Sequence, residues 1–303
     1  MARQSIVGAL GRASLVAVFA ALIFFPAHSL GKTAAHSRAF FWQVKKGKKV
    51  AYLLGSVHMA TKSMYPLSPA IESAFSKSDV IVLEARPDAV GQAQALALQK
   101  GMFRPPDSLK KHLSKKAFML VSKAAKRLGL PVMAVERMRP WLIAMTLVVL
   151  EFKGMGYDEK LGIEMHFFGK RGDKAIKELE GAKFQIDLLS SFSNKMQEQL
   201  LLYTLKDVAT MRREMTRMVS IWQRGDHQAM DRLLKESVRK TPQFRLVYKR
   251  IMTDRNVKMA KKVDAMLRGS KMKHFVIVGA GHLVGKKGLV ALLKKRGYTL
   301  KQY

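Results

Sequence analysis

The sequence contains no cysteine among its 303 residues. This absence excludes thiol nucleophiles, thiolate metal ligands and disulfide bonds. Any metal site in the chain must therefore use nitrogen and oxygen ligands, and the hydrophobic core must stabilise the fold without covalent cross-links.

Acidic residues are scarce: 22 aspartates and glutamates stand against 55 lysines and arginines, and none occurs before Glu72. A net charge of +33 attracts acidic peptides, anionic lipid head groups and other polyanions. The basic residues are spread along the whole chain, without a nucleic-acid-binding motif of interleaved aromatic residues. We therefore expect no nucleic-acid partner, and we keep a peptide or protein substrate and an anionic membrane surface as candidate partners.

Long hydrophobic runs are also missing. The apolar stretch Ala13–Phe25 has thirteen residues, whereas a membrane-spanning helix needs about 20. Arg3 and Arg12 precede this stretch, and the small residues of Pro26–Ser29 follow it. This pattern predicts a signal peptide at residues 1–29, followed by a single domain at residues 30–303 that is exported to the periplasm or the extracellular space. An uncleaved membrane anchor is the alternative.

The fold class follows from where the short apolar runs lie. Runs typical of strands occur at both ends of the chain, and a long, Met-rich helical pattern covers about residues 184–268, with breaks near Gly225-Asp226 and Thr241-Pro242. We predict an α/β (α+β) fold, with one mixed sheet built from N- and C-terminal segments, flanked by helices, and a large central helical insertion. The expected strands are residues 40–44, 50–54, 80–83, 132–135, 175–179, 275–278 and 298–301.

The pattern Gly-x-x-His occurs twice, as Gly55–His58 and as Gly279–His282, and each copy follows a strand-like apolar run. A glycine after a strand permits a sharp turn, and a histidine three residues later can then point back over the end of the strand. A lone histidine in a loop is commonly structural. Because the same context occurs twice, we expect His58 and His282 to meet in one pocket.

Glu84 and Glu180 also follow predicted strands. Two imidazoles and two carboxylates suit a divalent ion such as Mn, Co or Zn, with one position left for a water molecule. Such an ion lowers the pKa of its bound water from about 15.7 toward 7, which makes hydroxide available. We predict His58, Glu84 and His282 as metal ligands and Glu180 as a fourth ligand or as the base. Alternatively, each glutamate caps a helix or pairs with a basic side chain.

Three further polar residues are candidates for substrate binding. Arg139 and Arg255 could orient a substrate carbonyl or carboxylate during catalysis, as could Asn256. A surface salt bridge is the alternative role for either arginine.

Together, the order and spacing of these motifs resemble the TraB/GumN family, which includes PrgY, the bacterial GumN-like proteins and the TIKI proteases. The resemblance covers nearly the whole chain after the predicted leader. The segments that carry it are Tyr52–His58, Asp79–Glu84, Arg139–Trp141, Gly162–Glu164, Leu179–Glu180 with Gln185, Asp254–Asn256 and Val278–Gly285.

The resemblance implies a metal-dependent hydrolase, and in the TIKI branch a manganese- or cobalt-dependent peptidase. The family's two Gly-x-x-His histidines correspond to His58 and His282, and its strand-end glutamate corresponds to Glu84. Ser56 stands where threonine is common, and the central helical region is unusually basic. The alternative is a non-catalytic exported binding protein for a small peptide or a haem-like ligand.

Overall fold

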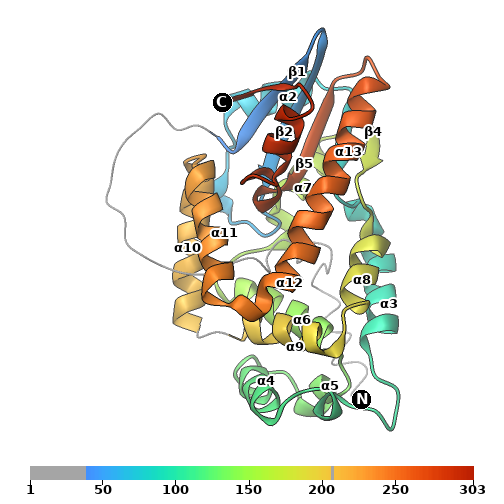
Figure 1. The fold of residues 1–303 in the computed structure, drawn as a ribbon, viewed down its shortest axis with the longest axis vertical. Coiled ribbons are helices and arrows are strands. Elements are labelled where there is room, and N and C mark those ends of the chain that lie inside the picture. Colours follow the sequence, from blue (N-terminus) through green and yellow to red (C-terminus); the bar gives the residue numbers. More distant parts are fainter. Residues whose placement is uncertain (1–38, 206–207) are drawn as a thin grey trace.

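The structure is a computed structural model, and it describes residues 39–205 and 208–303 (Figure 1). The predicted signal peptide at residues 1–29 lies outside these residues. Among the helices that are described, none combines the length and apolar character needed to cross a membrane.

A six-stranded mixed sheet runs in the order β4-β3-β5-β2-β1-β6. The hairpin of β1 (Phe41–Lys46) and β2 (Lys49–Ser56) is antiparallel and turns through Gly47, whose φ of 56° suits glycine. The C-terminal strand β6 (Thr299–Gln302) adds to the outer edge of β1, also antiparallel. The predicted assembly of one mixed sheet from both ends of the chain is confirmed.

The other half of the sheet is parallel. β5 (His274–Gly279) pairs with β2 on one side and with β3 (Val80–Leu83) on the other, and β3 pairs with β4 (Ala175–Glu178). All residues of β3 and β5 are buried, as expected for continuous apolar strands covered on both faces. Because these strands are parallel, the segments that follow β2, β3, β4 and β5 meet at one edge of the sheet.

Helices from several parts of the chain pack against the sheet. Phe275 of β5 contacts Phe75 of α2 (Pro69–Ser76) and Phe167 of α7 (Ile163–Gly169), with ring centroids 5.3 and 5.1 Å away. The long helix α13 (Asp254–Arg268) contacts β2 and packs on α14 (Leu289–Lys294). Helix α13 is central to the site because it supplies two of its polar side chains.

The remaining helices form the lower part of the molecule in Figure 1 and its left side. Helix α6 (Pro140–Gly154) is buried on nearly every face and packs on α9 (Asn194–Thr204), as its continuous apolar sequence indicates. The other α-helices are α3 (Val90–Gly101), α4 (Lys115–Arg127), α5 (Val132–Glu136), α8 (Ala182–Ser190), α10 (Val208–Gln223), α11 (His227–Lys240) and α12 (Arg245–Tyr248). The short 3-10 segments are η1 (Lys62–Met64), η2 (Pro87–Ala89), η3 (Leu109–Lys111), η4 (Glu159–Leu161), η5 (Pro242–Phe244) and η7 (Ala280–Leu283), and η6 (Lys249–Thr253) is a π-helical turn.

The predicted central helical region is confirmed, and its two breaks separate α10 from α11 and α11 from η5. One predicted strand is wrong: residues 132–135 belong to helix α5. Pro131 precedes the first turn of this helix, and Ala134 and Val135 are buried while Val132 and Met133 are exposed. A run of four apolar residues does not distinguish a strand from one helical turn, and residues 132–135 are not part of the six-stranded sheet.

Candidate active site at the carboxyl edge of the sheet

The two Gly-x-x-His loops leave the sheet side by side, because Ser56 of β2 is in register with Gly279 of β5. Gly55 is required by close packing: a Cβ atom there would lie 2.5 Å from the Phe40 ring and 3.1 Å from the Cα of Ala280. The indole of Trp222 donates a hydrogen bond to the Gly55 carbonyl at 2.7 Å. The glycine therefore lets the two loops approach each other, which is a different reason from the sharp turn expected from the sequence.

His58 is held by a carboxylate. Its Nδ1 lies 2.6 Å from Oε1 of Glu164, in the first turn of α7, and Ser56 Oγ donates to the same oxygen. Gly162 makes this approach possible, since a Cβ atom there would lie 2.3 Å from the His58 carbonyl oxygen. With Nδ1 donating to Glu164, the other ring nitrogen, Nε2, is buried and has no hydrogen-bond partner among the described residues.

His282 is held by an amide. Its Nδ1 lies 2.5 Å from Oδ1 of Asn256 on α13, while Nδ2 of Asn256 donates to the Lys287 carbonyl at 3.0 Å. That second bond makes Oδ1 the acceptor, so Nδ1 of His282 carries the ring proton. Its Nε2 is also buried and makes no hydrogen bond in the described part of the chain. This nitrogen lies 3.8 Å from Oε1 of Glu84, beyond hydrogen-bond distance.

Glu84 lies between the loops, and both of its carboxylate oxygens accept hydrogen bonds. Its Oε1 accepts a hydrogen bond from the Gly279 backbone N–H at 2.7 Å, and its Oε2 accepts from Arg255 at 2.6 Å and from Gln185 at 3.2 Å. Arg255 also binds Glu180, with distances of 2.9 Å from Nε to Oε1 and 2.7 Å from Nη2 to Oε2. One buried guanidinium thus neutralises half of the charge of two buried carboxylates, and each of these charges has several partners.

The pKa values of the two histidines are shifted in opposite directions. Burial alone lowers the pKa of His58, but the charge and hydrogen bond of Glu164, with the charge of Glu84, outweigh burial and raise it above 6.5. Burial, followed by the positive charge of Arg255, lowers the pKa of His282 well below 6.5, and the charge of His58 lowers it further. At neutral pH the ring of His282 is therefore neutral, with a free lone pair on Nε2.

The structure brings His58, Glu84, His282, Glu180 and Arg255 to one place, as the sequence predicts. Arg139 lies elsewhere: its guanidinium stacks on the Phe103 ring, 4.8 Å from the centroid, and its backbone N–H, just before α6, donates to the carbonyl of Gly101 at the end of α3. None of the contacts of Arg139 within residues 39–205 and 208–303 involves the residues of this site.

Sequence reasoning assigned no role to Glu164, although it belongs to the motif Gly162–Glu164. The available signal was a carboxylate two residues after a glycine, in the first turn of a helix. It also placed Asn256 on the substrate, whereas the structure places its amide on the ring of His282. Arg255 is a buried bridge between two carboxylates and not a surface ion pair.

The donor chemistry of the site suits a divalent cation. Each ring has a buried Nε2 atom without a hydrogen-bond partner among the described residues, and imidazole nitrogen is a ligand that Zn, Mn or Co accepts. The hydrogen bond at Nδ1 orients each ring, as in protein metal sites. The described residues contain no group of three or more His, Asp or Glu side chains arranged to hold a metal ion. Oε1 of Glu84 lies 3.8 Å from Nε2 of His282 and already accepts a hydrogen bond from the Gly279 N–H.

Comparison with known proteins matches residues 40–302 to the TraB/PrgY/gumN family, which confirms the resemblance seen in the motifs. Among curated proteins, the chain is 26% identical over 250 residues to the uncharacterized protein YbaP of Shigella flexneri, covering 82% of this chain and 89% of that protein. The same figures hold for the uncharacterized protein YbaP of Escherichia coli strain K12. No solved structure matches.

Proposed function

The chain belongs to the TraB/PrgY/gumN family, and on that premise we propose that it is a metal-dependent hydrolase that acts on a peptide or protein substrate. His58 and His282 would each bind the ion through Nε2, in the case of His58 with release of its Nε2 proton to solvent, and Glu84 would supply an oxygen ligand. The observation that carries this proposal is the pair of buried Nε2 atoms without partners. Leaving such atoms unsatisfied costs about 1–3 kcal/mol each, and a cation would satisfy both.

Each neighbouring side chain has a definite part in this proposal. Glu164 and Asn256 hold the two rings through Nδ1, so that Nε2 of each is left as the metal-binding atom. Arg255 and the Gly279 N–H hold the Glu84 carboxylate between the two loops. A bound Mn, Co or Zn ion would supply an activated water molecule for hydrolysis.

The role of Glu180 as a fourth ligand or as the base stays a prediction. Both of its oxygens accept hydrogen bonds from Arg255, and one also accepts from Gln185. These contacts favour a positioning role, in which Glu180 fixes Arg255 and Arg255 fixes Glu84. In this arrangement Glu180 acts on the site through the arginine.

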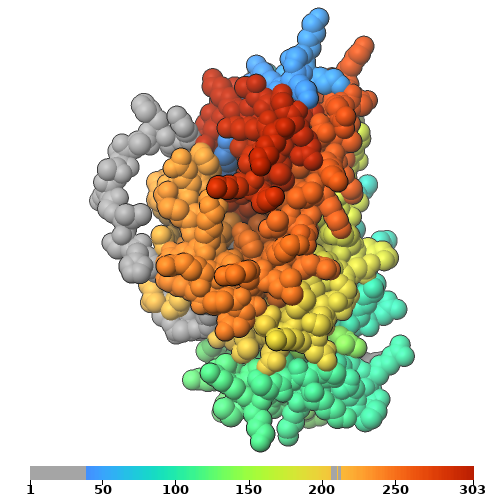
Figure 2. Space-filling view, in the orientation of Figure 1, coloured from blue at the N-terminus to red at the C-terminus, as the bar shows by residue number. Residues whose placement is uncertain are grey.

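Export belongs to the same proposal and rests on the leader-like pattern of residues 1–29. Attachment to an anionic membrane surface is favoured by helices α4 and α5, at the lower end of the molecule in Figures 1 and 2. Residues 108–135 contain six lysines, one arginine and no acidic residue, and Met119 and Met133 are 67% and 76% exposed there. Salt-sensitive co-sedimentation with phosphatidylglycerol vesicles, and none with phosphatidylcholine vesicles, would support this attachment.

Metal binding by purified protein is the direct test of the hydrolase proposal. We expect calorimetric titration with Mn, Co or Zn to detect one site in the wild type, and His58→Ala and His282→Ala to abolish it while the circular dichroism spectrum is unchanged. His112→Ala is the matched control, because His112 also pairs with a carboxylate, Asp107 at 2.8 Å, outside the site. If both site variants bind metal as the wild type does, the proposal is wrong.

Turnover is tested separately with a peptide library and each metal. Cleavage that needs His58, His282 and the ion supports a peptidase. A visible absorption band on haem addition, combined with no cleavage under any metal condition, would instead support the alternative of a non-catalytic binding protein.

A further inference from the structure

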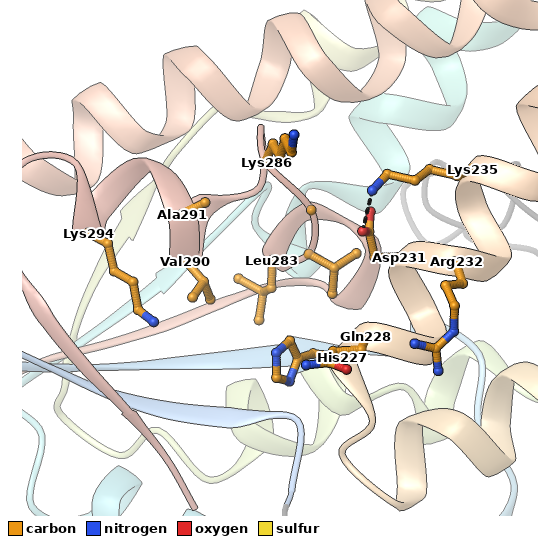
Figure 3. Close-up of a pocket in the computed structure, with 12 residues that line it drawn as sticks. His227, Gln228, Asp231, Arg232, Lys235, Leu283, Lys286, Val290, Ala291 and Lys294 are labelled. Carbon is orange, nitrogen blue, oxygen red and sulfur yellow. Dashed lines mark hydrogen bonds and ion pairs between the residues drawn. The ribbon is translucent and has the colours of Figure 1, made fainter.

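A surface groove of about 480 Å³ lies beside the loop that carries His282 (Figure 3). Its walls come from α11, from the end of η7 and the residues after it, and from α14. The volume falls within the range of about 300–1,000 Å³ that is typical of small-ligand sites. Leu283 and Val284, which directly follow His282, line the groove, so that the groove and the candidate active site share one loop.

The lining combines apolar and basic side chains. The apolar part comes from Leu283 and Val284 and from two residues of α14, Val290 and Ala291. The charged part contains four cations and one carboxylate, a net charge of 4 − 1 = +3, from Arg232, Lys235, Lys286, Lys294 and Asp231. The groove is therefore amphipathic and positively charged.

The one carboxylate that lines the groove, that of Asp231, is already paired. Asp231 pairs with Lys235, one turn later on α11, at 2.6 Å. It also lies against Gly285, where a Cβ atom would be 2.5 Å from Asp231 Oδ1 and where the φ of 78° favours glycine. The glycine lets the loop approach the helix closely, and the aspartate is thereby fixed beside Lys235 (Figure 3).

Three cations of the groove remain available. Within the described residues, Arg232, Lys286 and Lys294 have no carboxylate within 4 Å, and all three side chains are exposed. Arginine binds carboxylates through a planar pair of N–H donors, and lysine adds a point charge. In the groove these three cations lie around the apolar side chains of Leu283, Val284 and Val290.

We propose that this groove binds an anionic segment of the peptide substrate, in which an aliphatic side chain lies between two acidic ones. Lys294 and Arg232 lie at opposite ends of the groove (Figure 3), so each would pair with a separate carboxylate of the segment, and the aliphatic side chain between them would cover Leu283 and Val290. The identity of the ligand as substrate rests on the proposed peptidase function. The binding itself does not, because it needs neither the metal nor His58.

The test is calorimetric titration with an acetylated, amidated peptide of alternating leucine and glutamate, with its leucine–glutamine counterpart as the uncharged probe. We expect only the acidic peptide to bind, and Arg232→Gln with Lys294→Gln to weaken binding about tenfold, the loss of one to two charge-assisted contacts. The matched control is Lys45→Gln with Lys48→Gln, which removes the same charge from the exposed β1–β2 hairpin. This control should change the affinity less than about twofold.

Two outcomes overturn the proposal: unchanged binding by the groove variant, or equal weakening by the groove and hairpin variants, which would mean non-specific attraction to a basic surface. Repeating the titration with EDTA and with His58→Ala separates this proposal from the hydrolase proposal. Acidic-peptide binding that survives both, in a protein that shows no cleavage, retains the groove as a binding site and rejects the catalytic function.

Discussion

Compared with the first Gly-x-x-His loop, the second holds its histidine in a more positive environment. Nδ1 of His58 faces the carboxylate of Glu164, and that of His282 faces the neutral amide of Asn256 while Arg255 lies nearby. The pKa of His58 is accordingly raised and that of His282 is lowered, although both rings are buried. The same four-residue pattern thus yields two imidazoles of different proton affinity, because the elements packed against each loop differ.

The largest expected effect comes from removing the charge that lies between the loops. Arg255→Met leaves Glu84 and Glu180 buried without their cation, and we expect the free energy of unfolding to fall by about 3–5 kcal/mol in urea titrations. Arg86→Ala is the control, since it breaks an exposed pair with Asp88 and should lower the free energy of unfolding far less than Arg255→Met does.

Adding Glu84→Gln and Glu180→Gln to Arg255→Met should recover part of the loss, because the buried charges are then gone. A loss for Arg255→Met alone that is no larger than that of the Arg86 control would contradict the view that this arginine compensates the two carboxylates.

The second prediction makes the first loop resemble the second. Glu164→Gln keeps an acceptor near His58 but removes the charge, so we expect the His58 pKa, followed by NMR, to fall and metal affinity to drop about 10–100-fold. Glu72→Gln is the control, because Glu72 pairs with His166 outside the site at 2.8 Å. Unchanged metal affinity in Glu164→Gln would show that the carboxylate does not support a metal ligand.

The third prediction concerns the pH dependence of stability in the metal-free protein. Since the pKa of His282 is lowered in the fold, its stabilising contribution is present above pH 6.5 and is lost as pH falls below that value. His58, with a raised pKa, contributes oppositely: its contribution is present below pH 6.5 and is lost as pH rises through its folded pKa.

His282→Asn should therefore lessen the loss of stability on acidification below pH 6.5, by up to about 1.4 kcal/mol per pH unit relative to wild type. His58→Asn should instead steepen that loss slightly or leave it unchanged. Urea unfolding at several pH values measures both, and identical slopes for His282→Asn and wild type would refute the assignment.

The smallest expected effect is at Ser56, whose hydroxyl donates to the oxygen of Glu164 that also faces His58. Ser56→Ala should cost about 1 kcal/mol of unfolding free energy, because one buried hydrogen bond is lost. Ser56→Thr keeps the hydroxyl and should lower the free energy of unfolding less than Ser56→Ala, with both measured by urea titration. A loss for threonine as large as for alanine would argue that packing, and not this hydrogen bond, is important at residue 56.

Several features of the site could be predicted because they follow from local patterns. Buried parallel strands are continuous apolar runs, and residues that follow such strands lie at one edge of the sheet, so His58, Glu84 and His282 come together. The pairing of Arg255 with two carboxylates could not be predicted: Arg255 lies 171 residues from Glu84 in sequence and reaches it only through the packing of α13. Helix α5 was misread as a strand because four apolar residues carry no clear period.

The sequence by itself determined the six strands of the sheet, the paired glycine–histidine turns, the absence of thiol chemistry and the strongly basic surface, because these depend on composition and on short-range periodicity. Only the tertiary structure decided which group holds each imidazole, that one arginine joins two carboxylates, and that a basic groove adjoins the loop of His282. The physical reason is that burial and charge pairing act between side chains that are distant in sequence, and their effects on proton affinity depend on distances that exist only once the chain has folded.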